Sequence, residues 1–134
     1  MKASRFYGVA AVLLVLFSVG HTLGFRQTDP SWGVDNLLSS LRALHFSAQG
    51  FNRTYYDFYV GFGLFVSVLL FFAALVAWQL AAMSSEMLAQ MTLLRWAFAI
   101  CFVAVTVLSW RYCFAVPVIF SAGITLFLIV ATCL

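Results

Sequence analysis

Charged side chains are scarce in this sequence, and nearly all of them lie outside its long apolar runs. Lys, Arg, Asp and Glu make up 8% of the 134 residues, against about 25% in a typical soluble domain. The seven basic residues form no run of the kind that indicates a nucleic-acid partner. Only Arg95 interrupts the four apolar runs, which are Phe6–Gly24, Phe58–Met83, Met91–Trp110 and Cys113–Leu134.

The sequence also lacks the motifs of the common enzyme classes. It contains no GxSxG, no HExxH, no glycine-rich nucleotide loop and no CxxC pair. No span carries an arginine stripe or a mid-span carboxylate, which excludes a voltage sensor and an ordinary proton-driven transporter. The three cysteines are too far apart for a redox motif, so we expect them to pack as small apolar residues in helix interfaces: Cys101, Cys113 and Cys133.

Each apolar run is long enough to cross a bilayer, because about 20 helical residues span roughly 30 Å of hydrocarbon. We therefore predict one all-α transmembrane domain, residues 1–134, with spans at about 6–24, 57–82, 91–110 and 113–134. The first run reaches spanning length at Gly24, so we expect a retained helix rather than a cleaved leader. Short connections at Ser84-Ser85-Glu86 and Trp110-Arg111-Tyr112 predict antiparallel neighbours and an up-down-up-down four-helix bundle.

The single long connection, residues 25–54, is predicted to contain a turn and a short helix. Asp29-Pro30-Ser31-Trp32-Gly33 is typical of a turn, and Asp35 or Asn36 is expected to cap a helix that runs to about Ala48. Gln49-Gly50 would end that helix. Its leucines recur at helical spacing, so we expect it to lie along the membrane surface or to fold over the mouth of the bundle as a lid.

Tryptophan and tyrosine cluster near the predicted span ends, where their polar groups reach water. Tyr7, Trp78 and Trp96 are expected on the side of the termini, and the others on the side of the long loop: Trp32, Tyr55, Tyr56, Tyr59, Trp110 and Tyr112. Basic residues are nearly balanced between the two sides. Because Lys2 and Arg5 closely flank the first span, we predict that both termini are cytoplasmic, in a bacterial inner (plasma) membrane.

Most polar side chains gather at the long-loop end, where we expect any binding or catalytic site. His21 lies about one turn inside the first span, and ionisable groups in spans often mark functional sites. The candidate catalytic residues are His21, Asp57 and Tyr56. The candidate ligand-binding residues are His21, His45, Arg53, Tyr55, Tyr56, Asp57, Tyr59, Trp110 and Arg111.

Structural roles remain open for several of these residues. A neutral His21 would bond to a backbone carbonyl or a tyrosine, and Arg53 and Asp57, four apart, would pair on one helical face as an anchor. Small and hydroxyl residues at four-residue spacing indicate helix packing in membranes. These packing residues are Gly63, Ser67 and Ala74 in the second span and Ser121 and Thr125 in the fourth.

Three functional hypotheses follow, and no motif identifies a family. The first is a bundle that binds a lipid or another lipophilic small molecule at the long-loop end, with acid–base chemistry as an extension. The second is a non-catalytic accessory or assembly subunit of a larger membrane complex, or a homo-oligomer, whose 15 phenylalanines offer an outward packing surface. The third is a haem-binding bundle with His21 or His45 as ligand. No other metal site has a recognisable ligand spacing.

Overall fold

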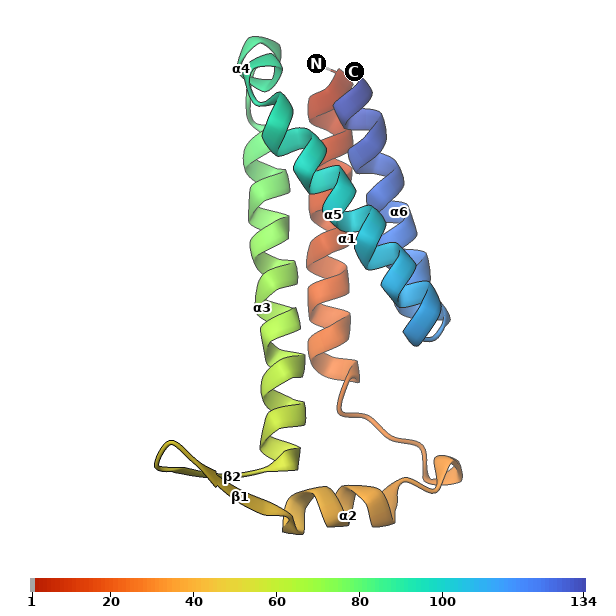
Figure 1. The fold of residues 1–134 in the computed structure, drawn as a ribbon. Coiled ribbons are helices and arrows are strands. Elements are labelled where there is room, and N and C mark those ends of the chain that lie inside the picture. Colours follow the sequence, from red (N-terminus) through yellow and green to blue (C-terminus); the bar gives the residue numbers. More distant parts are fainter. Residues whose placement is uncertain (1) are drawn as a thin grey trace. The chain divides into compact units, whose positions relative to one another are not determined.

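The computed structural model describes residues 2–134, and these are helical apart from one small hairpin and the connecting segments (Figure 1). Helices hold 81% of the chain. The elements in chain order are α1 (Lys2–Gly24), the 3-10 turn η1 (Pro30–Trp32), α2 (Asp35–Ala43), β1 (His45–Ala48), β2 (Phe51–Thr54), α3 (Tyr55–Ala81), α4 (Ser85–Gln90), α5 (Thr92–Tyr112) and α6 (Ala115–Cys133).

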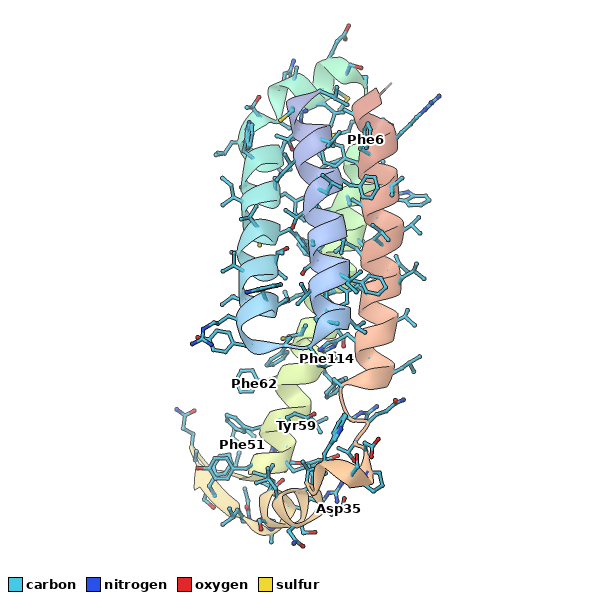
Figure 2. All side chains as sticks on the ribbon, turned by 90° about the vertical axis from the view of Figure 1, so that its right-hand side faces the viewer. Phe6, Asp35, Phe51, Tyr59, Phe62 and Phe114 are labelled. Carbon is cyan, nitrogen blue, oxygen red and sulfur yellow. The ribbon has the colours of Figure 1, made fainter. Side chains whose placement is uncertain are left out.

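Four of these helices are long and apolar enough to cross a bilayer: Ala3–Gly24, Tyr55–Ala81, Thr92–Tyr112 and Ala115–Cys133. The predicted four-helix, up-down-up-down membrane fold, with a short helix between the first two spans, is confirmed. Apolar side chains point outward along the spans, and Phe62 and Phe114 are exposed examples (Figure 2). In a bilayer such side chains face hydrocarbon, so their exposure does not indicate poor packing.

The described chain forms two compact units. The larger unit comprises Met1–Ser18 and Leu70–Leu134, and the smaller unit, Val19–Leu69, is called the long-loop unit below. The boundary falls within α1 and α3, so each of these helices contributes residues to both units. The larger unit contains the buried core, whereas the long-loop unit contains most of the predicted site residues.

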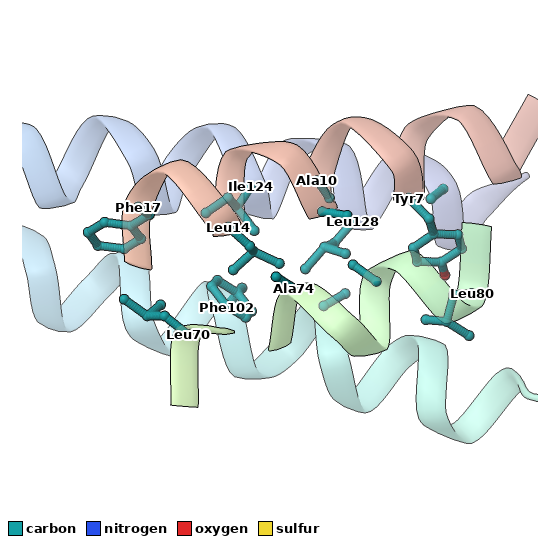
Figure 3. Packing of buried hydrophobic residues seen from close by; sticks show 14 of the residues in the cluster. Tyr7, Ala10, Leu14, Phe17, Leu70, Ala74, Leu80, Phe102, Ile124 and Leu128 are labelled. Carbon is teal, nitrogen blue, oxygen red and sulfur yellow. The ribbon is translucent and has the colours of Figure 1, made fainter. Parts of the chain in front are cut away.

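The core of the larger unit combines small and large side chains from α1, α3, α4, α5 and α6 (Figure 3). Ala10 and Ala74 are buried beside leucines such as Leu14 and Leu128, which lets the helix backbones approach closely. Phe17 stacks on Phe120 with ring centroids 5.3 Å apart. The predicted packing role of span four agrees with this arrangement, because Ser121 is fully buried and the Thr125 hydroxyl lies 2.9 Å from that of Thr106.

The only charged residue of the apolar runs, Arg95, is buried in the larger unit at 8% exposure. Its Nε donates to the Tyr7 hydroxyl (3.2 Å) and one terminal nitrogen donates to the Leu88 carbonyl (3.2 Å). The other terminal nitrogen donates to the carbonyls of Ala131 (2.7 Å) and Thr132 (3.0 Å). Those two carbonyls belong to the last turn of α6, where the helix dipole favours a cation. Arg95 therefore caps α6 from α5 and also joins it to α1 and α4.

Tyr7 belongs to this network and not to an aromatic belt, so that part of the sequence prediction is wrong. The ring is completely buried, and its hydroxyl lies 3.2 Å from Thr132 Oγ1. The Thr132 hydroxyl donates to the Leu128 carbonyl at 2.8 Å, which leaves its oxygen to accept from Tyr7. Membrane depth alone could not separate a tyrosine that reaches water from one that meets a buried guanidinium.

Two connections differ from the sequence prediction. The short helix α2 ends at Ala43 rather than near Ala48, and the following residues form an antiparallel hairpin that pairs His45 with Thr54 and Ala48 with Phe51. Gln49 and Gly50 both have positive φ, 53° and 84°, as a two-residue type I′ turn requires. The end of a helix and a hairpin turn both favour residues that tolerate positive φ, so the sequence pattern at this pair does not distinguish them.

The predicted polar turn at Ser84-Ser85-Glu86 is the start of the short helix α4. The Ser84 side chain accepts a hydrogen bond from the Met87 amide at 3.3 Å, as an N-cap residue does. The cysteine prediction is also wrong, because Cys101, Cys113 and Cys133 are all exposed rather than enclosed in helix interfaces.

Replacing Arg95 with methionine tests the network, because methionine fills similar space without donors. We expect the free energy of unfolding to fall by roughly 1–3 kcal/mol, since buried acceptors lose a charged donor. Thermal unfolding in mild detergent measures the change. Arg111→Met is the matched control because Arg111 is exposed; equal unfolding temperatures for the two variants would contradict a structural role for the network.

Candidate functional site

The long-loop unit contains every predicted site residue except Trp110 and Arg111. It is built from the last turns of α1, the helix α2, the hairpin β1–β2 and the first four turns of α3. α3 has 27 residues, which at 1.5 Å per residue exceeds the length that the hydrocarbon requires. Its first turn can therefore lie at the level of the lipid headgroups.

His21 is half-buried and interacts with α3 and with the residue that follows α1. Its Nδ1 lies 3.1 Å from the Ser67 hydroxyl, and Ser67 Oγ is also 3.2 Å from the Gly63 carbonyl. The imidazole stacks on the Phe25 ring, with centroids 5.3 Å apart and planes 12° from parallel. The hydrogen-bond partner expected for His21 was a backbone carbonyl or a tyrosine. The structure instead gives it the hydroxyl of Ser67, four residues after Gly63.

Phe25 is positioned by two residues of α3. The Tyr59 hydroxyl donates a hydrogen bond to the Phe25 carbonyl, and the two rings are 6.0 Å apart. The Phe25 ring occupies the space that a Cβ at Gly63 would take. Gly63 therefore serves close approach, as its spacing predicted, but the group that approaches is an aromatic ring.

The rings of Phe25, Tyr59 and Tyr56 form a continuous series, called the aromatic row below. Tyr59 and Tyr56 are 6.1 Å apart, and the guanidinium of Arg42 lies 4.5 Å from the Tyr56 ring centroid. At the other end, the Arg26 guanidinium lies 5.4 Å from the Phe25 centroid. The row thus has a cation over each end, and no hydrogen bond joins the Tyr56 hydroxyl to another described residue.

Asp57 has a local structural role. Its carboxylate accepts from the Thr54 amide (2.8 Å), and the Thr54 hydroxyl accepts from the Asp57 amide (3.0 Å). This reciprocal pair is a capping box at the start of α3. The predicted Arg53–Asp57 pair on one helical face is wrong, because Arg53 lies in β2. The Arg53 guanidinium donates to the Asn52 carbonyl (2.8 Å) and lies 5.4 Å from the Phe51 ring.

His45 and Tyr55 belong to the hairpin region and not to the aromatic row. His45 is exposed, with its Nδ1 3.2 Å from the Asn52 side-chain oxygen, and Tyr55 packs against Phe46 at 5.2 Å. Among residues 2–134, no three or more His, Cys, Asp and Glu side chains gather where they could hold a metal ion. Haem ligation by His21 or His45 stays a prediction.

Trp110 and Arg111 lie at the end of α5 in the larger unit. Trp110 lines a shallow depression of about 310 Å³ together with five residues of the α5–α6 turn and the start of α6. The Arg111 guanidinium lies 5.6 Å from the Tyr112 ring. The depression is apolar and open, and its other lining residues are Cys113, Phe114, Ala115, Val118 and Ile119.

Sequence reasoning missed three members of this arrangement: Phe25, Arg26 and Arg42. The first two follow the end of the first apolar run, where no sequence pattern places them beside the second span. One signal was present, since Tyr56 and Tyr59 are three residues apart and share a helix face. The approach of Phe25 and Arg42 to that face depends on the path of the loop, which has no pattern of its own.

Asp29 also has a local partner, in the turn that precedes η1. Its carboxylate accepts a hydrogen bond from the Ser31 amide at 2.8 Å. Hydrogen bonds from the side chain and the amide of Ser31 hold the pKa of Asp29 below its ordinary value. The carboxylate is therefore charged at neutral pH, and the turn loses this contribution only when the pH falls through that lowered pKa.

Comparisons of the chain with protein-family models, with curated proteins and with solved structures found no match.

Gly63→Ala tests the placement of Phe25. Alanine favours a helix over glycine by about 1 kcal/mol, so the variant should be stabilised unless the added Cβ displaces the ring. We expect a lower unfolding temperature in detergent. Gly61→Ala is the control two residues away, where a Cβ would meet no atom within 4 Å, and it should raise the temperature. A higher unfolding temperature for both variants would show that the Phe25 ring does not occupy the space beside Gly63.

Proposed function

We propose that the protein binds a membrane lipid, or another amphipathic lipophilic molecule, at the aromatic row of the long-loop unit. The observation that carries the proposal is the row itself: three contacting rings at the junction of two apolar spans with the loop, and an arginine over each end. Aromatic rings with polar edges and long arginine side chains are the groups that proteins place at the headgroup level of a bilayer.

The surface helix supports the same placement. α2 is amphipathic, and Leu37 at its start and Leu44 just after its end are exposed. An amphipathic helix too short to span lies in the membrane interface with its apolar face toward the acyl chains. This arrangement would present a lipid both to α2 and to the aromatic row, whose cation Arg42 belongs to the last turn of α2.

Binding has more support than catalysis. Asp57 and Thr54 satisfy each other at the start of α3, and His21 already shares a hydrogen bond with Ser67. Of the three candidate catalytic residues, only Tyr56 forms no side-chain hydrogen bond to another described residue. Acid–base chemistry by these residues stays a prediction.

A role as an accessory subunit, or as a homo-oligomer, stays a prediction. The exposed phenylalanines of α3 would suit a helix of a partner, but they suit lipid tails equally well. Residence in a bacterial plasma membrane with cytoplasmic termini also stays a prediction. An even number of spans returns both termini to one side, and an activity reporter fused after Leu134 would identify that side.

Tyr56→Ala tests lipid binding, because it removes the ring that lies beneath Arg42 at one end of the row without removing a hydrogen bond between described residues. We expect the purified full-length protein to retain roughly twofold to tenfold less lipid, the range for loss of one aromatic contact. Native mass spectrometry of protein extracted in mild detergent measures the retained lipid.

Two controls separate binding from folding. Tyr112→Ala removes an exposed tyrosine that also lies beside an arginine, and it should leave lipid retention unchanged. Asp57→Asn should lower the unfolding temperature by weakening the capping box and yet keep the lipid. Equal lipid retention by the Tyr56 and Tyr112 variants would refute the proposed function.

A further inference from the structure

We propose that the lipid bound at the aromatic row is an anionic phospholipid whose headgroup is recognised by Arg42 and Arg26. This inference rests on the proposed function and names the class of its ligand. The inference follows from which charged groups of the long-loop unit already have partners. The net charge and the apolar pattern of the sequence do not reveal those partners.

Two of the three acidic residues of this unit accept hydrogen bonds from backbone amides, and the third lies in the first turn of a helix. Asp57 caps α3, Asp29 accepts from the Ser31 amide, and Asp35 lies in the first turn of α2, where the helix dipole favours a carboxylate. Each acid therefore stabilises a local turn or helix start. Among the described residues, neither Arg26 nor Arg42 forms an ion pair with any of them.

The two arginines instead lie over rings. Arg42 lies over Tyr56 and Arg26 over Phe25, and no described residue accepts a hydrogen bond from either guanidinium. A ring covers one face of a guanidinium and leaves the N–H groups at its edge directed outward. That edge matches two oxygens of a phosphate, which is why arginine is common where phosphate is recognised.

The position of the row favours a lipid phosphate over a soluble one. Phe25 directly follows the last residue of α1, and Tyr56 and Tyr59 lie in the first two turns of α3. Both helices are long and apolar enough to span. At such junctions the arginines reach the headgroup level while the rings beneath them contact the glycerol and upper acyl region.

Arg53 provides a matched control within the same unit. Its guanidinium also lies over a ring, that of Phe51, at 5.4 Å, the same distance as Arg26 from Phe25. Phe51 contacts no ring of the aromatic row in the described structure, and Arg53 already donates to the Asn52 carbonyl. Replacing Arg53 removes the same charge from the unit and leaves the row intact.

The test compares lipid selection by the full-length protein in nanodiscs that contain equal amounts of phosphatidylcholine and phosphatidylglycerol. Lipids that remain bound after detergent extraction are counted by native mass spectrometry. We expect the unmodified protein and Arg53→Gln to retain phosphatidylglycerol preferentially. The double variant Arg26→Gln/Arg42→Gln should lose that preference by roughly fivefold for each arginine.

Each other outcome overturns the inference in a distinct way. Preference kept by the double variant, or lost equally by Arg53→Gln, would show that these two arginines do not read the headgroup. Displacement of the lipid signal by millimolar glycerol phosphate would point to a soluble phosphate ligand. Lipid retention without preference, still reduced by Tyr56→Ala, would preserve the proposed function and overturn only the assignment of an anionic headgroup.

Discussion

The buried guanidinium of Arg95 is the interaction on which the larger unit depends. A bilayer interior offers no water to a polar group, so each donor and acceptor must find a partner within the protein. Arg95 donates to four groups on three other helices and occupies the electronegative end of α6. Its charge is thereby compensated by carbonyl dipoles, and a residue that is costly in an apolar span becomes the connection between α1, α4, α5 and α6.

In the long-loop unit the acidic residues, rather than the arginines, form most of the hydrogen bonds between charged side chains and the backbone. Asp57 caps a helix and Asp29 a turn, whereas Arg26 and Arg42 lie over half-buried rings and have no carboxylate partner among the described residues. The net charge of such a unit says little about binding, because two of its three carboxylates accept backbone hydrogen bonds, whereas neither Arg26 nor Arg42 pairs with a described carboxylate. This difference, rather than the number of polar residues, is what supports ligand binding at the long-loop unit.

Run length and connection length were sufficient to predict the spans and their antiparallel order, because hydrocarbon thickness sets the first and chain reach the second. The same reasoning failed where one residue type serves two purposes. Gln49-Gly50 formed a hairpin turn rather than a helix end. Tyr7 met Arg95 rather than water, and Asp57 capped its own helix rather than pairing with Arg53. The deciding factor was a residue distant in sequence for Tyr7, a backbone amide for Asp57 and the backbone conformation for Gln49-Gly50.

The sequence by itself determined that this chain crosses a membrane and that its polar residues concentrate beside one long loop, since the cost of burying charge in lipid depends on composition alone. It also identified His21, Tyr56 and Tyr59 as members of a candidate site. Only the tertiary structure decided which polar groups are already satisfied. Hydrogen bonds and ring contacts act over a few ångströms, so the joining of Phe25, Tyr59, Tyr56 and Arg42 depends on how the loop returns to α3.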